Sequence, residues 1–219
     1  PKQKKEGPMK LGDIKIEAMK LMFVNYNIDF RIEQLEQLAQ DENYGSYLVN
    51  MPGAINRCFS SLEEKGVLPV KTYVLSPSEA LASGSFLRFD LASLIDDFFD
   101  IERVVYENDN EEYIGDYEYR REGNVIVLAN IGEGEHYTVL YKPKLERITA
   151  STENTYEIPI PDNIASHIPY FIKGDLYRDD EPNEASEARN WYEAAMEGIT
   201  ESKVNKVNRV QSIYSQTEI

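Results

Sequence analysis

TYEIPIPDNIASHIPYFIKGDLYRDDEPNEASEARNWYEAAMEGI, residues 155–199, contains the elements that decide the fold. It predicts a strand, a proline-marked corner, a helix kinked at Pro169 and Gly174, an acidic break and a second amphipathic helix. Asp162 is a good N-cap for the first of these helices. One face of the second helix carries small and large apolar residues: Ala185, Ala188, Trp191, Tyr192, Ala195, Met196 and Ile199. The alanines predict close packing against another helix.

Helical patterns also precede this stretch, near the N-terminus. Apolar residues recur at helical spacing over 11–24, 31–41 and 44–65. We expect Pro52-Gly53 to bend or restart the third helix, because proline lacks a backbone donor and clashes with the preceding turn. Gly66 supplies a C-terminal stop.

The middle of the chain is typical of strands. Residues 70–76, 85–91 and 98–107 are rich in β-branched and aromatic residues. Turn residues around Gly123 and Gly132 predict an antiparallel meander over 98–141. We expect TYEIPI (155–160) to return to the same sheet.

The order of these patterns predicts an α+β fold, in which N- and C-terminal helices form a bundle and an antiparallel β module is inserted between them. The expected bundle covers 11–68 and 162–200, and the expected β-rich module covers 69–161. A basic N-terminal arm at 1–10 and an extended C-terminal arm at 201–219 complete the chain, with Ile213 and Tyr214 as anchors in the latter.

The charge distribution limits the possible partners. The ends, 1–10 and 202–219, carry +3 and +2, so the total of −16 leaves −21 for residues 11–201. Such an acidic body repels nucleic acid. The basic ends either contact an acidic partner or remain solvated. No apolar run approaches the ~20 residues of a membrane-spanning helix, so we expect no membrane partner.

Catalytic and metal-binding patterns are weak in this sequence. Cys58 is the single cysteine, and His136 and His167 are too far apart for a local metal motif. Asp96, Asp97 and Asp100 could hold a hard cation, but no calcium-loop spacing follows them, and a solvated loop explains them better. We therefore expect no enzymatic activity, no metal and no cofactor.

The 15 tyrosines raise the question of base stacking, which also needs a positively charged groove. Around Tyr113, Tyr117 and Tyr119 the balance is instead acidic, since residues 96–122 contain eleven acidic residues against three arginines. Strand packing or a protein interface explains these tyrosines better, because tyrosine is enriched at interface cores.

Two segments carry a resemblance to a known family. IPIPDNIASHIPYFIKGDLYRDDEP with EARNWYEAAMEGI (158–182 and 187–199) places Ile168-Pro169-Tyr170, Asp179-Asp180 and Trp191-Tyr192 in sequence. AINRCFSSLEEKGVLPVKTYVL (54–75) has an Asn-Arg pair in a helix and then Leu-Pro. Both resemble the head-to-tail adaptor (connector) proteins of short-tailed phages, of the tail tubular protein A type. The middle of the chain matches only by layout.

The resemblance implies a structural virion protein in the neck between capsid and tail, assembled in the host cytoplasm. It implies a homo-oligomeric ring, commonly a dodecamer, attached below the portal protein, with DNA passing through without specific binding. The helical part and the C-terminal segment typically face the portal, whereas the β module typically meets tail or nozzle proteins. No enzymatic activity or cofactor is implied.

Contact residues can be predicted on this basis. The candidates for portal contact are Lys203, Lys206, Arg209, Ile213 and Tyr214, and those for inter-subunit contact are Trp191, Tyr192 and Met196. Tyr113, Tyr117 and Tyr119 are the candidates on the tail side. The inter-subunit face could equally belong to the core of the monomer.

Other functions remain open at this point. A tail terminator or stopper would share the ring but bind the tail tube first. A non-viral module that binds carbohydrate or protein would instead use the aromatic-rich meander, with a pocket lined by Tyr113, Tyr117 and Tyr119.

Overall fold

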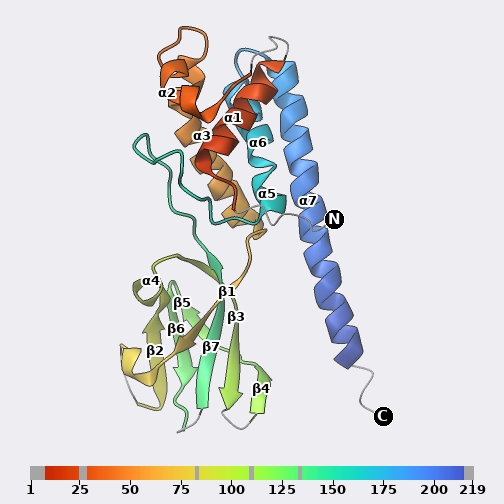
Figure 1. The fold of residues 1–219 in the computed structure, drawn as a ribbon. Helices are drawn as coiled ribbons and strands as arrows, with labels where there is room; N and C mark the ends of the chain where they lie inside the picture. Colours follow the sequence, from red (N-terminus) through yellow and green to blue (C-terminus); the bar gives the residue numbers. More distant parts are fainter. Residues whose placement is uncertain (1–7, 25–28, 82–83, 109–110, 133–134, 215–219) are drawn as a thin grey trace, which may run out of the picture. The chain divides into compact units, whose positions relative to one another are not determined.

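The computed structural model describes residues 8–24, 29–81, 84–108, 111–132 and 135–214, with the backbone alone at 108, 111–116 and 203–214. The chain forms two compact units (Figure 1). Residues up to Val67 and from Arg147 onward form one, here called the helical unit, and Leu68–Glu146 form the other, the β unit. The predicted α+β class is confirmed.

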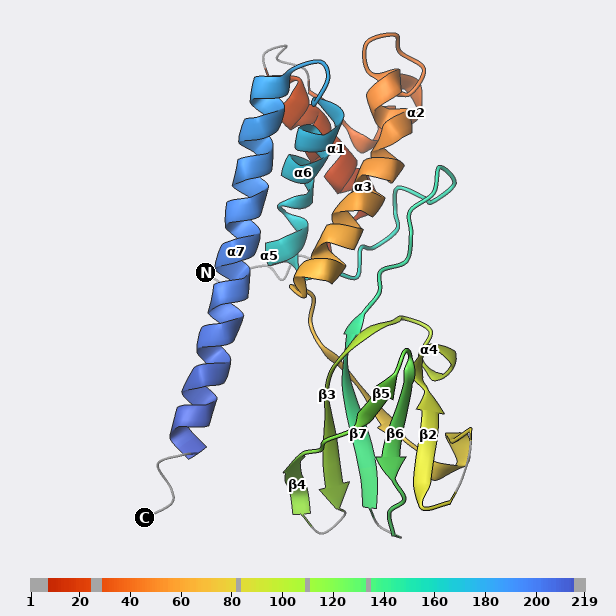
Figure 2. The ribbon, with the colours of Figure 1, turned by 180° about the vertical axis from the view of Figure 1, so that it is seen from behind.

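The helical unit is built around one central helix. Its elements are α1 (Leu11–Met22), the 3-10 turn η2 (Ile32–Gln34), α2 (Leu35–Leu38), α3 (Gly45–Lys65), α5 (Asp162–Ala165), α6 (Ile168–Leu176) and α7 (Pro182–Tyr214). Helix α6 packs against α1, α3 and α7 (Figures 1 and 2). A helix with neighbours on several sides must be apolar around much of its circumference, and α6 accordingly buries Ile168, Phe171 and Ile172. Its neighbours contribute Leu11, Ile14, Met19, Met51, Ile55, Phe59, Leu62, Ala185, Ala188, Tyr192 and Met196.

Gly174 allows α6 and α7 to approach closely. A Cβ at this position would lie 3.1 Å from the carbonyl oxygen of Ala185 and 3.2 Å from the backbone nitrogen of Arg189. Backbone atoms of a packed helix cannot move aside as a flexible side chain can. The glycine is therefore required by the spacing of the two helices.

We expect Gly174→Ala to lower the free energy of unfolding by about 1–2 kcal/mol, because overpacking outweighs the better helix propensity of alanine. Gly198→Ala is the matched control, since a Cβ at Gly198 in α7 would meet nothing within 4 Å. That change should be neutral or stabilising. Urea denaturation followed by far-UV circular dichroism compares the two, and equal stability of both variants would contradict the expectation.

The segment TYEIPI does not return to a sheet, and this prediction is wrong. It lies in the helical unit, where Ile158 and Ile160 are buried and Glu157 forms an isolated bridge with Lys10. The backbone N–H groups of Leu11 and Gly12 donate to the carbonyls of Tyr156 and Asn154, both at 2.9 Å. The segment thus satisfies donors that the first turn of α1 leaves open. Its prolines, at 159 and 161, cannot donate to a strand ladder.

Two helices that contain or adjoin a proline also differ in part from the prediction: α3 does not restart at Pro52, and the helix after Asp162 is divided. Helix α3 continues through Pro52, since Met51, Ala54 and Ile55 on either side are held in the core. The kinked helix after Asp162 is two helices, α5 and α6, and Pro169 lies in the first turn of α6, where no backbone donor is needed.

The prediction of an extended arm at 201–219 is wrong for residues 201–214, which belong to α7, and residues 215–219 lie outside the described residues. After Gly198 the sequence contains neither glycine nor proline until the end of this helix, and Lys, Arg, Glu and Gln favour helix. The small number of large apolar residues in this segment predicts an arm, but a helix that is exposed to solvent has the same composition. Figures 1 and 2 show α7 continuing past the ends of the other helices of its unit.

The β unit contains two antiparallel sheets among its described residues. Their strands are β1 (Lys71–Leu75), β2 (Phe86–Asp90), β3 (Phe98–Asn108), β4 (Glu111–Asp116), β5 (Arg120–Glu122), β6 (Val125–Ala129) and β7 (Glu135–Pro143). The first sheet has the order β1-β7-β3-β4 and the second β2-β6-β5. The 3-10 turn η3 (Pro77–Glu79) and helix α4 (Leu91–Leu94) connect strands.

A simple meander over 98–141 is therefore also wrong. Strand β3 pairs with β4 and with the distant β7, whereas β6 pairs with β2 and β5 in the other sheet. Alternating side chains from both sheets share one core that includes Leu87, Phe89, Ile101, Val104, Ile126, Leu128, Tyr137 and Val139. Each sheet has one apolar face, and the two sheets bury these faces best by packing them against each other.

Candidate interaction surface

The Asn-Arg pair of α3 holds the helical unit together from one side. The Asn56 side chain donates from Nδ2 to the carbonyl of Ile148 (2.7 Å) and accepts from the Ile148 N–H at Oδ1 (2.8 Å). The neighbouring Arg57 donates from Nε and Nη2 to the Asp175 carboxylate of α6. Asn56 therefore fixes the chain where it re-enters this unit, and Arg57 links α3 to α6.

Three arginines lie on this side of the unit: Arg57 of α3, Arg147 after the β unit and Arg189 of α7. Together they are called the arginine face below. Arg189 stacks on the Phe171 ring, with its guanidinium carbon 4.1 Å from the ring centroid, and its Nε lies 3.3 Å from Glu193. Stacking and ion pairing together hold the guanidinium in place.

Two of the three carboxylates that pair with the arginine face lie deeper than their arginines, whereas the Glu193 side chain is 40% exposed, against 41% for its partner Arg189. Glu63 pairs with Arg147 at 2.7 Å, and its side chain is only 2% exposed. The Asp175 side chain is 15% exposed, against 56% for its partner Arg57. The outer layer of this surface therefore carries guanidinium groups together with the carboxylates of Glu193 and Glu64.

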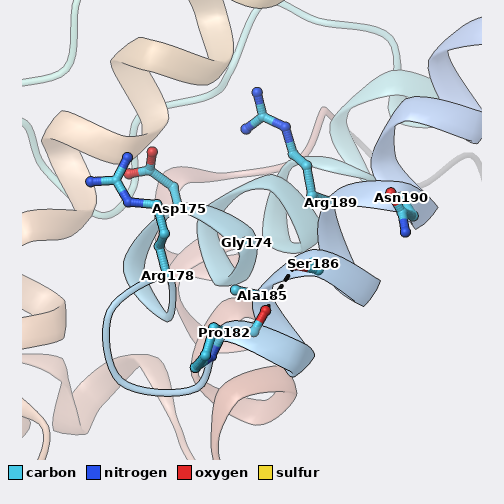
Figure 3. Close-up of a pocket in the computed structure, with 8 residues that line it drawn as sticks. All are labelled: Gly174, Asp175, Arg178, Pro182, Ala185, Ser186, Arg189 and Asn190. Carbon is cyan, nitrogen blue, oxygen red and sulfur yellow. Dashed lines mark hydrogen bonds between the residues drawn. The ribbon is translucent and has the colours of Figure 1, made fainter.

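Two hollows adjoin the arginine face. One, of about 580 Å³, is lined by all three arginines, by the carboxylates of Glu64 and Asp175, and by Gly53, Asn56, Ser60, Ser61 and Phe171. The other, of about 410 Å³, lies between α6 and α7. Figure 3 shows Asp175 and Arg178 on one side of it and Arg189 and Asn190 on the other, with Gly174 and Ala185 between. Both hollows are lined by Asp175 and Arg189, so they adjoin each other.

The three predicted inter-subunit residues have different positions. Trp191 is 64% exposed on α7, but Tyr192 and Met196 are buried in the core of the unit. The Tyr192 hydroxyl lies 3.5 Å from Ser61 Oγ and 3.8 Å from the Cys58 sulfur. Burial raises the pKa of the Tyr192 hydroxyl and raises that of the Cys58 thiol to about 12. Only Trp191 of the three is accessible to a partner.

The predicted portal-contact residues all lie on the last part of α7. Lys203, Lys206, Arg209, Ile213 and Tyr214 belong to this helix, and their side chains lie outside the described residues. Their shared position on one helix, rather than on an extended arm, follows from the length of α7.

The predicted tail-side tyrosines do not form a common pocket among the described side chains. Tyr117 and Tyr119 pack against the core of the β unit, and the Tyr117 ring lies 4.9 Å from that of Tyr137. Tyr113 lies on β4, and its side chain is outside the described residues. A groove of about 450 Å³ is lined by Phe86, Arg88, Tyr117, Glu118, Arg120, Val127 and Ala129, so Tyr119 does not line it.

The aspartates at 96–100 pair with basic side chains. Asp97 accepts from Lys71 and from the Tyr141 hydroxyl, and Asp100 pairs with Arg121. His136 lies 3.0 Å from Glu107 in the β unit, whereas His167, whose pKa is lowered by burial, belongs to the helical unit. Within the described part of the chain, no group of three or more His, Cys, Asp or Glu side chains is arranged to hold a metal ion.

We expect Asp97 to make the β unit sensitive to acid. Burial raises the pKa of this carboxyl, but the hydrogen bonds from Lys71 and Tyr141 and the charge of Lys71 outweigh burial and hold the pKa below its usual range. A lowered folded-state pKa contributes stability above the unfolded-state value of about 3.9 and loses it as the pH falls through the folded value.

Asp97→Asn should therefore lose less stability than the parent chain when the pH is lowered from 7 to about 3. Hydrogen exchange of the β3 and β7 amides at both pH values measures this difference. Asp96→Asn, at an exposed acidic position of the same unit, is the control. An equal loss in the parent and Asp97→Asn would contradict the assignment.

Sequence reasoning did not find the arginine face. Arg57, Arg147 and Arg189 are distant in the sequence, and nothing in their local spacing connects them. The single signal was Asn56-Arg57 in a helix, whose partners only the structure supplies.

Among the described residues, no helix combines the length and apolar character needed to cross a membrane. Comparison of the chain with models of protein families finds no match, and a search of curated proteins also finds none.

Proposed function

We propose that the protein is a head-to-tail adaptor of a bacteriophage virion. In this role, copies of the chain form a ring in the neck, attached to the portal protein above and to tail or nozzle proteins below. The proposal starts from the resemblance of 45–75 and 136–199 to such adaptors. It assigns the protein a structural role with no catalytic step and no cofactor.

The observation that carries the proposal is the length of α7. This helix has 33 residues, or about 50 Å at 1.5 Å per residue. Met196 is its last buried residue among the described side chains, and the helix continues for about 27 Å after it, past the ends of the other helices of its unit (Figures 1 and 2). A helix that continues past its own unit in this way is suited to bind a neighbouring protein.

The charge of the body supports passage of DNA without binding. Residues 11–201 carry most of the negative charge, and a duplex in an acidic channel is repelled and exchanges few counterions. We propose that carboxylates line or flank the lumen of the ring. A map of the assembled neck with a predominantly basic lumen would contradict this part of the proposal.

The experiment that tests the role of α7 is truncation after Ser202. This change removes every predicted portal-contact residue and keeps Met196, the last buried residue of α7 among the described side chains. We expect the truncated protein to keep its circular dichroism spectrum, less the removed helix, and to lose capture by the portal protein encoded in its own genome. Pull-down and sedimentation measure this capture.

Truncation after Tyr214 is the matched control, because it keeps all five candidates and should keep portal capture. Undiminished capture after truncation at Ser202 would refute the role of α7. Capture by tail-tube protein in place of the portal would instead indicate the terminator or stopper role.

A further inference from the structure

Lys15 of α1 is a half-buried lysine that forms no ion pair with the described side chains. Its Nζ donates to Asn154 Oδ1 at 2.8 Å, although an ammonium can donate more than one hydrogen bond. Burial lowers the pKa of this ammonium, and no carboxylate charge offsets the effect. By contrast, carboxylates pair with Lys20, Lys65, Lys71, Lys142 and Lys173. Since a charge taken out of water normally has a partner of opposite charge, Lys15 favours an acceptor from outside the chain.

A hollow of about 510 Å³ is lined by Lys15, by residues of α2 and α3 and by the loop at 150–155. Part of its lining is apolar and consists of Leu35, Ala39, Leu48, Val49 and Pro52. Another part carries the hydroxyls of Ser151, Thr152 and Thr155. Sites for small molecules usually have volumes of roughly 300–1,000 Å³ and combine apolar surface with a few polar groups. The hollow has both properties, and its ammonium can be reached by whatever enters it.

The loop beside α1 is held by hydrogen bonds within the protein. The Gly12 N–H donates to the Asn154 carbonyl at 2.9 Å, in addition to the bond from Lys15 to the Asn154 side chain. A Cβ on Gly12 would lie 3.0 Å from that carbonyl oxygen, so the loop and α1 are in close contact. Within the loop, the Thr149 N–H donates to Thr152 Oγ1 at 2.9 Å. The fold therefore positions Asn154, and Lys15 with it, which lowers the entropic cost of binding a ligand here.

Two carboxylates also line the hollow, and they limit the charge of a ligand. Glu36 and Glu153 are both exposed, and Glu153 accepts from Thr155 Oγ1 at 3.1 Å. Neither pairs with Lys15, whose pKa shift arises from burial. One ammonium and two carboxylates give the lining a formal charge of −1, so it repels an ion with several negative charges. A single carboxylate loses less to this repulsion and gains a charge-assisted hydrogen bond from Lys15.

We infer that this hollow binds a small monocarboxylate with an apolar chain, whose carboxylate accepts from Lys15 Nζ and whose chain covers the apolar part of the lining. Val49, which is 68% exposed, is the part of that lining with most surface left to cover. Because the hydrophobic contribution grows with the apolar area buried, affinity should rise from acetate to hexanoate. The inference concerns a single copy of the helical unit and does not rest on the adaptor role.

The test titrates the full chain with sodium hexanoate at neutral pH and follows the backbone amide signals by NMR. We expect saturable shifts at Lys15, Val49 and Asn154. Acetate, which lacks the chain, and 1-hexanol, which lacks the carboxylate, should each bind about tenfold more weakly or worse. Phosphate should also bind more weakly than hexanoate, because of Glu36 and Glu153. If 1-hexanol or phosphate bound as tightly as hexanoate, the inference would be overturned.

Lys15→Met is the central variant, because methionine has a similar length and packs well but carries no charge. It should weaken hexanoate binding about tenfold. Lys20→Met is the matched control in the same helix, since Lys20 pairs with Glu17, and it should leave binding unchanged. Glu36→Gln with Glu153→Gln should tighten binding by removing repulsion, and circular dichroism checks that each variant is folded. Equal affinity of Lys15→Met and Lys20→Met, or no saturable binding by the parent chain, would overturn the inference and leave the adaptor role standing.

Discussion

Replacing Tyr192 with alanine is expected to lower the free energy of unfolding by about 3–5 kcal/mol, the usual cost of removing a buried aromatic ring. Tyr192 is 0% exposed and lies where α7 meets α3 and α6. Its ring packs edge-on against Phe171 at 5.0 Å between centroids. The cavity left by alanine would be enclosed by three helices, none of which can close it without losing its other contacts. A domain stabilised by 5–15 kcal/mol in total would then be marginal.

Tyr192→Phe is the control that separates packing from hydrogen bonding. The hydroxyl lies 3.5 Å from Ser61 and 3.8 Å from the Cys58 sulfur, and both contacts are long. Removing it should cost less than about 1 kcal/mol. Urea denaturation of the three proteins, followed by circular dichroism, measures the difference. If Tyr192→Ala were as stable as Tyr192→Phe, the ring would not be part of the core as described.

Arg147→Ala is expected to be the second most destabilising change, at about 3 kcal/mol. The cost arises because the Glu63 carboxylate, which is almost fully buried, would lose its ion pair. Breaking a buried pair costs roughly 3–5 kcal/mol. The low end applies here because Arg147 is itself partly exposed, so water can reach part of the vacated space.

A double-mutant cycle with Glu63→Gln tests the origin of this effect. Glu63→Gln in the Arg147→Ala background removes the buried charge that has lost its arginine, so it should recover part of the lost stability. In the parent chain the same change should destabilise, because it weakens the pair with Arg147. Additive effects of the two substitutions would show that the ion pair does not couple them, which would contradict the explanation.

The sequence predicted whether a region forms helix or strand better than it predicted which other region it pairs or packs with. Periodicity at 11–24 and 44–65 found α1 and α3, since an amphipathic stripe depends only on residues a few positions apart. The alternating pattern at 155–160 was a weaker guide. Ile158 and Ile160 are buried as a strand would bury them, but they cover the start of α1, and the pattern alone cannot specify a partner.

Prediction of the surface was limited for a related reason. Trp191, Tyr192 and Met196 share one stripe in the sequence, yet a rotation of about 100° per residue leaves Trp191 exposed and Tyr192 buried. Helical spacing indicates that a stripe exists, but its exact centre depends on where α3 and α6 lie. The arginine face depends in the same way on chain segments that meet only in the folded protein.

The most direct test of the adaptor role is reconstitution of the full chain with the portal protein of its own genome, followed by electron microscopy of the product. The account predicts a closed ring of copies coaxial with the portal, with the last part of α7 in contact with it. A protein that stays monomeric beside an intact portal ring at high concentration, or that comes from a genome without any portal gene, would contradict it.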